Sequence, residues 1–189
     1  RFQEKMLPVM FEGTKYAHCF PIGTMEVVMN FKPQTLRDYY EKWYRPDLQG
    51  IVVVGDIDVD VIEAQIKKMF SDIPAQPNAA KREYYPVNDN KEPIVIIYKD
   101  KEQPNVQALV FNKHENTPDT EKTNMGYLLQ DYAITLINNM LNARLNELVQ
   151  TANPPYIYAT TYDDNFFVAK TKDAFTGIVV CKEDAIENG

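Results

Sequence analysis

Two pairs of extended apolar segments, each joined by a short connection, limit the fold most strongly. The first pair covers 94–100 and 106–112, and the second covers 156–162 and 174–181. These segments are rich in β-branched and aromatic residues, which is typical of strands. A parallel crossover needs a dozen or more residues, so connections this short predict antiparallel pairing within each pair.

Three helical patterns accompany these strands. Apolar side chains recur at helical spacing over 33–44, after Asp58, and over 119–150, where the length indicates two helices or one bent helix. Helices packed on one face of a mostly antiparallel sheet are the simplest arrangement of these elements. The sequence therefore predicts an α+β fold, a two-layer sandwich.

The stretch 45–58 contains a further predicted strand and a turn. Its apolar run, 51–54, is typical of a strand covered on both faces. Gly55 follows, but a phosphate-binding loop needs several glycines, and Asp56 and Asp58 would repel a phosphate. We interpret Gly55 as a turn residue in a conformation that disfavours a Cβ, and Asp58 as the N-cap of the next helix.

The chain reads as one domain with an attached segment. Residues 1–30 are punctuated by prolines and glycines and are predicted to form an irregular arm or interdomain linker. Residues 31–189 are predicted to form a single α+β domain. Because the chain starts at Arg1 without an initiator Met, we expect it to be a piece of a longer protein.

Composition argues against several classes of function. The net charge is −7 and the pI about 4.9, which disfavours nucleic-acid binding, since that binding needs Lys and Arg to neutralise phosphates. The sequence has no apolar run of the length of a membrane span. Cys19 and Cys181 lie too far apart in sequence to indicate a disulfide framework.

The residue types needed for catalysis are scarce. The chain has two histidines, His18 and His114, which are too far apart to form the inverted zinc motif H-x-x-E-H. Its one serine, Ser71, lies at a predicted helix end and not in a nucleophile elbow. Adjacent acids such as Asp163 and Asp164 lie in presumed turns. We therefore predict no catalytic residue, no cofactor-binding residue and no metal ligand in this chain.

Three segments resemble the pitrilysin/insulinase family of zinc peptidases. Residues 21–70 resemble that family's helix ending in W-Y-R-P-D, followed by an apolar strand, G-D-I-D and a helix closing on Phe. The segments MLNARLNELVQ (140–150) and PYIYATTYDD (155–164) are similar to a helix and a strand of the family. The resemblance covers nearly the whole chain, and its first segment is the specific one.

The resemblance implies a place in a larger enzyme. In that family each half of the molecule holds two related α+β domains, and the zinc motif belongs to the first. This chain is thus expected to be the non-catalytic second domain of the N-terminal half, with zinc bound upstream. The same layout implies that a last helix follows residue 189.

One departure from the family concerns substrate binding. Where the family's second half has a substrate-binding Arg followed seven positions later by Tyr, this chain has Val149 and Tyr156. Without the guanidinium group of that arginine, the site would bind peptide groups more weakly. Tyr156 is the single candidate substrate-binding residue, and strand packing is its alternative role.

The resemblance implies a structural domain that helps to wall a chamber around peptide substrates. Its expected partners are the zinc-binding domain, the second half of the parent chain and peptides. The alternative is an inactive scaffold or peptide-binding subunit of the same fold. A nucleotide-binding domain is a third reading, which would predict stabilisation by ATP. For the compartment, our hypothesis is the periplasm or cell envelope.

Overall fold

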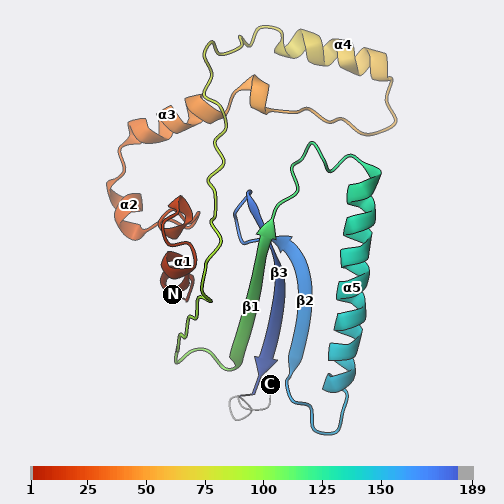
Figure 1. The fold of residues 1–189 in the computed structure, drawn as a ribbon. Coiled ribbons are helices and arrows are strands. Elements are labelled where there is room, and N and C mark those ends of the chain that lie inside the picture. The colour runs from red at the N-terminus through yellow and green to blue at the C-terminus, as the bar shows by residue number, and fades with distance from the viewer. Residues whose placement is uncertain (1, 183–189) are drawn as a thin grey trace. The chain divides into compact units, whose positions relative to one another are not determined.

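The computed structural model describes residues 2–182 and confirms the α+β fold (Figure 1). Its elements follow the order α1 (Phe2–Met10), η1 (Lys15–Ala17), α2 (Met25–Asn30), α3 (Pro33–Trp43), η2 (Pro46–Leu48), α4 (Val59–Phe70), β1 (Val106–Glu115), α5 (Met125–Val149), β2 (Tyr158–Asn165) and β3 (Lys172–Cys181). The chain divides into two compact units, one formed by 1–21 with 84–189 and one by 22–83.

The sheet of the first unit has the order β1-β3-β2, and both pairings are antiparallel. The hairpin predicted from the last two strands is confirmed, with Tyr158 opposite Val180. The hairpin predicted between 94–100 and 106–112 is wrong, since 94–100 forms no strand. β1 pairs instead along its whole length with β3. Because β3 also pairs with β2, it is the central strand of the sheet.

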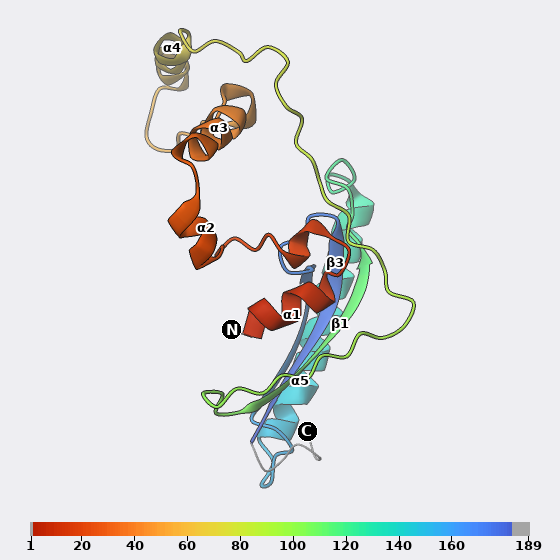
Figure 2. The same ribbon diagram turned by 90° about the vertical axis from the view of Figure 1, so that its left-hand side faces the viewer.

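The helical region predicted over 119–150 is one helix, α5, of 25 residues. It starts at Asn124, whose side chain accepts a hydrogen bond from the Tyr127 N–H, the usual geometry of an N-cap. α5 packs along the sheet and contacts β2 (Figure 1). In Figure 2, α5 lies behind the sheet and α1 in front of it.

An aromatic core joins the beginning of the chain to its last hairpin. Phe11 follows α1, is 1% exposed and lies 5.0 Å, centroid to centroid, from the ring of Phe166. Residues 1–30 thus contain helices and core side chains, although their sequence shows no clear helical pattern. The assignment of 1–30 as an arm or linker, and of 31–189 as one domain, stays a prediction.

The second unit, 22–83, has an unusual distribution of apolar side chains. All of its residues are described, and Arg45 is the one side chain in it that is buried. The strand predicted at 51–54 is absent, and Val52 and Val54 are 85% and 91% exposed. An extended segment becomes a strand only when a neighbour satisfies its backbone groups, and 22–83 contains no strand to pair with this segment.

The turn at Gly55 needs no special backbone conformation. Gly55 does not have a positive φ, and a Cβ added there would lie 3.8 Å from its nearest neighbour, Cγ2 of Ile57. The interpretation that this position disfavours a Cβ is therefore wrong. The N-cap is confirmed, since a carboxylate oxygen of Asp58 accepts a hydrogen bond from the Val61 N–H at 3.1 Å.

These contacts predict that two neighbouring substitutions have different effects on stability. Asp58→Ala removes the cap of α4 and should lower the free energy of unfolding of 22–83 by about 1 kcal/mol. Gly55→Ala, the matched control, should change that free energy by less than about 0.5 kcal/mol, because the added methyl group makes only an ordinary van der Waals contact with Ile57. Urea denaturation followed by fluorescence of Trp43, the single tryptophan, measures both. Equal effects would contradict the cap.

Candidate functional site

The W-Y-R-P-D stretch is organised by the buried guanidinium of Arg45. Its Nε donates to the Asp47 carboxylate at 2.8 Å, Nη1 donates to the Lys42 carbonyl at 2.7 Å, and Nη2 donates to the Ala80 carbonyl. One side chain thus holds the end of α3, the turn η2 and the segment near residue 80 together. A planar fork of five donors suits this task, which a lysine could not perform. The stretch is a structural anchor of 22–83.

Tyr156, the predicted substrate-binding residue, lies in a small apolar cluster between α5 and the sheet. It is 7% exposed, and its hydroxyl donates a 2.7 Å hydrogen bond to the carbonyl of Leu145. Val149, which stands where the family has arginine, packs against the same cluster. Burial raises the pKa of the Tyr156 phenol above its ordinary value of 10.0. These contacts fit a packing role, and substrate binding by Tyr156 stays a prediction.

Tyr156→Phe should lower the free energy of unfolding by about 1 kcal/mol, because it removes the hydroxyl and leaves the Leu145 carbonyl without this donor. The difference from wild type should be present below about pH 10 and shrink at higher pH. The raised folded-state pKa means that the unfolded chain loses the phenol proton first, which favours unfolding of the wild type alone. Urea denaturation at pH 8 and pH 11 tests this, and a pH-independent difference would contradict it.

The residue types that could serve catalysis or bind zinc do not converge. His18 and Cys19 are both exposed, and Cys181 is buried apart from any partner thiol. Among residues 2–182, no three His, Cys, Asp or Glu side chains are placed to hold a metal ion. The described residues therefore do not fit a zinc ion.

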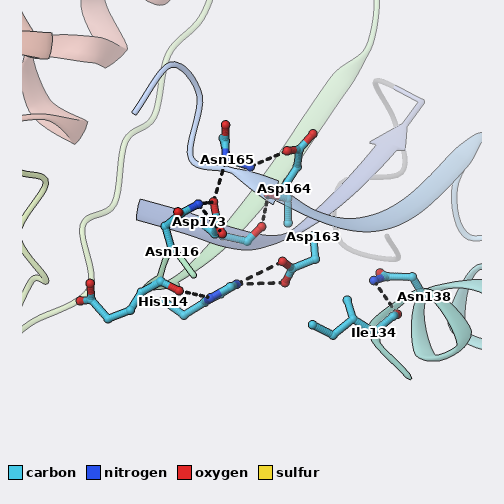
Figure 3. Close-up of polar contacts among 11 residues, drawn as sticks. His114, Asn116, Ile134, Asn138, Asp163, Asp164, Asn165 and Asp173 are labelled. Atoms are coloured by element: carbon cyan, nitrogen blue, oxygen red, sulfur yellow. Dashed lines mark hydrogen bonds and ion pairs between the residues drawn. The ribbon is translucent and has the colours of Figure 1, made fainter. Parts of the chain in front are cut away.

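A polar cavity of about 450 Å³ lies between the N-terminal half of α5 and one end of the sheet. The end of β1, the end of β2 and the start of β3 meet there, so strands far apart in sequence bring their polar side chains together (Figure 3). Sheet residues that line it include His114, Asn116, Asp163, Asp164, Asn165 and Asp173. The helix contributes Asp131, Asn138, Asn139 and Asn142.

Hydrogen bonds fix the sheet side of this cavity. His114 Nε2 lies 3.1 Å and 3.2 Å from the two carboxylate oxygens of Asp163. The Asp173 carboxylate accepts from the side-chain amides of Asn116, at 2.8 Å and 2.9 Å, and of Asn165, at 2.7 Å. Figure 3 shows both groups at the strand ends. The carboxylates are therefore held in place.

Asn142 joins the helix to the edge of the sheet. Its Oδ1 accepts a hydrogen bond from the Thr161 N–H at 2.7 Å, and its Nδ2 donates to the Thr161 carbonyl at 2.9 Å. The outer edge of β2 has no strand beside it among the described residues. The side-chain amide therefore provides at this position the donor and acceptor that a neighbouring strand would provide.

The sequence did not single out these cavity residues. Asp163 and Asp164 were predicted to be solvated turn residues, whereas they belong to the last part of β2 and line the cavity. One signal was available: three asparagines, Asn138, Asn139 and Asn142, occur within a predicted helix interior. Asparagine is disfavoured there, because its amide competes for backbone hydrogen bonds, so a cluster of this kind indicates tertiary polar contacts.

Comparison with known proteins identifies relatives of this chain. The family model described as "Peptidase M16 inactive domain" matches residues 30–168. The chain is 27% identical over 151 residues to "Probable zinc protease PqqL" of Escherichia coli, covering 80% of this chain and 16% of that protein. It is 26% identical over 178 residues to "Zinc protease PQQL-like" of Arabidopsis thaliana, covering 91% of this chain and 18% of that protein.

Solved structures show the same fold. The crystal structure of the periplasmic protease PqqL from Escherichia coli matches with a TM-score of 0.77 at 23% identity, over 100% of this chain and 20% of that one. A structure of the first half of the same protease matches with a TM-score of 0.76 at 22% identity, over 99% and 39%. The chain thus spans less than a fifth of the two curated relatives described above.

Proposed function

Since the chain belongs to the M16 peptidase family and matches its inactive domain, we propose that it forms part of the wall of a chamber in which a larger zinc peptidase encloses peptide substrates. The resemblance to pitrilysin-like zinc peptidases is confirmed. The family match over 30–168 is the observation that carries this proposal. The relatives named as zinc proteases support a non-catalytic domain of a zinc peptidase.

The distribution of apolar side chains supports a role in contacts with other domains. In 22–83, large apolar side chains of every helix are exposed, among them Val27, Leu36, Tyr39 and Met69. Exposed apolar surface on this scale is typical of an interface. The proposed partners are the zinc-binding domain and the second half of the parent chain, with peptides as substrates.

Zinc, in this proposal, is held by the upstream domain. There the ion would activate a water molecule for attack on a peptide carbonyl. This chain would contribute surface from each of its two units, where Arg45 stabilises 22–83 and the aromatic core around Phe11 stabilises the other unit. No helix among residues 2–182 is long and apolar enough to cross a membrane.

Zinc titration and peptide hydrolysis test the proposal. The chain of 189 residues alone should bind no stoichiometric zinc and cleave no peptide, whereas the parent protein should show hydrolysis that a chelator abolishes. Tight zinc binding with chelator-sensitive hydrolysis by the 189-residue chain would overturn the proposal. A parent that lacks an H-x-x-E-H helix and cleaves no peptide would instead support the inactive scaffold or peptide-binding subunit.

We propose the periplasm as the compartment of the parent protein. The support is the solved structure of a relative that is described as a periplasmic protease. Fractionation of cells that express the parent protein tests this proposal. Recovery of the protein with the periplasmic contents is expected, and recovery in the cytoplasmic fraction alone would contradict it.

A further inference from the structure

We propose that the polar cavity between α5 and the sheet binds an organic cation, through an ammonium or a guanidinium group. This inference concerns only residues within the unit formed by 1–21 and 84–189. It does not depend on the chamber role proposed above. It rests on an unpartnered buried acceptor, on the charge of the lining and on the size of the cavity.

The unpartnered acceptor is Oδ1 of Asn138. The residue is 8% exposed, and its Nδ2 donates to the Ile134 carbonyl at 3.1 Å, within α5. Its Oδ1 is buried and accepts no hydrogen bond from any described residue. Figure 3 shows the side chain directed from the helix toward the strand that carries Asp163. A buried acceptor without a donor costs about 1–3 kcal/mol, so its presence points to a ligand with N–H groups.

The charge of the lining favours a positive ligand. Five carboxylates line the cavity: Asp131, Asp163, Asp164, Asp173 and Glu115, of which Glu115 is ion-paired with Lys172 outside the lining. The one lysine in the lining, Lys122, is hydrogen-bonded to Asp119 outside it at 3.0 Å, and this bond raises the pKa of the ammonium. The imidazole of His114 is already bound to Asp163. The lining therefore has a clear excess of negative charge.

The arrangement of these acceptors suits a ligand with several N–H groups better than a metal ion. A divalent cation needs several oxygen ligands that converge on one point. Among the described residues, no group of three His, Cys, Asp or Glu side chains meets that requirement. The acceptors are spread instead around about 450 Å³, on both the helix and the sheet. Guanidinium and ammonium groups carry several donors that can reach separate acceptors.

Two sources could supply such a cation, a free small amine or a basic side chain of a peptide. Calorimetric titration of the 189-residue chain distinguishes them. The probes are n-butylammonium, n-butylguanidinium, and the peptides acetyl-Gly-Arg-Gly-amide and acetyl-Gly-Gln-Gly-amide. We expect the arginine peptide to bind at least tenfold more tightly than the glutamine peptide. If the small cations bind as tightly as the arginine peptide, the site is one for free amines.

Two substitutions test the assigned acceptors. Asn138→Leu removes the orphan oxygen with little change of volume, and Asp163→Asn removes one charge from the sheet side. Each should weaken binding of n-butylguanidinium about tenfold, with the far-UV circular dichroism spectrum unchanged. Asp163→Asn preserves the test if Asn138→Leu fails to fold. Glu147→Gln, on an exposed part of α5 outside the cavity, should leave the affinity unchanged.

Three results would overturn the inference. One is the absence of measurable binding of either small cation and of the arginine peptide to the wild-type chain. The second is equal affinity for the arginine and glutamine peptides. The third is an affinity for n-butylguanidinium that neither Asn138→Leu nor Asp163→Asn changes. None of these results bears on zinc binding or peptide hydrolysis by the parent protein, so the chamber proposal is tested separately.

Discussion

Phe11→Ala is expected to lower the free energy of unfolding of the unit formed by 1–21 and 84–189 by about 3–5 kcal/mol. Phe11 is the largest fully buried side chain of the described residues. Its ring lies 5.0 Å from the ring of Phe166, 5.5 Å from Tyr16 and 6.0 Å from Phe167, centroid to centroid. Truncation would leave a cavity among rigid rings and remove the contacts between them.

The measurement is urea denaturation followed by far-UV circular dichroism. Val9→Ala, in α1 just before Phe11 but with an exposed side chain, is the matched control and should change the free energy by less than about 0.5 kcal/mol. A loss below about 1 kcal/mol for Phe11→Ala would mean that the first residues do not contribute to this core. Among residues 2–21, Phe11 is the most completely buried, so its truncation is expected to have the largest effect there.

Asn142→Ala is expected to lower the free energy of unfolding of the same unit by about 2–3 kcal/mol. The substitution removes both hydrogen bonds between the side-chain amide and the backbone of Thr161. Thr161 is itself buried, so water does not readily replace the lost partner. The loss is therefore larger than for a single exposed hydrogen bond, for which about 1 kcal/mol is usual.

Asn139→Ala is the matched control for this prediction. Asn139 follows Asn138 on α5, is exposed, and has no hydrogen bond to the sheet among the described contacts. Alanine is the better helix former, so Asn139→Ala should leave the stability unchanged or raise it slightly. Thermal denaturation of the two variants side by side gives the comparison. Equal melting temperatures would contradict the role of Asn142 at the edge of β2.

Local patterns predicted much of the secondary structure. The helical spacing over 33–44 corresponds to α3, and the apolar stripe after Asp58 corresponds to α4. The strands around 106–112, 156–162 and 174–181 are present, each with shifted ends. In these segments, periodicity, caps and turn residues all favour the same element.

Strand formation at 51–54 and 94–100 could not be decided in this way. Both runs have the composition of strands, but a strand exists only where another backbone accepts its hydrogen bonds, and composition does not identify that partner. The hairpin predicted for 94–100 is wrong for this reason. β1 pairs instead with β3, although α5 and β2 lie between them in the sequence. The cavity could not be predicted from the sequence for the same reason, since pairing between distant strands brings its carboxylates together.

The contact between Phe11 and Phe166 has a consequence for the order of events during synthesis on the ribosome. Phe11 is synthesised well before Phe166, and its ring can be covered only after Phe166 has left the exit tunnel. Until then, the nascent chain carries an exposed aromatic side chain that a chaperone could recognise. This unit is therefore expected to complete its core only after Phe166 has emerged, and release of the chain before Phe166 would leave α1 without that core.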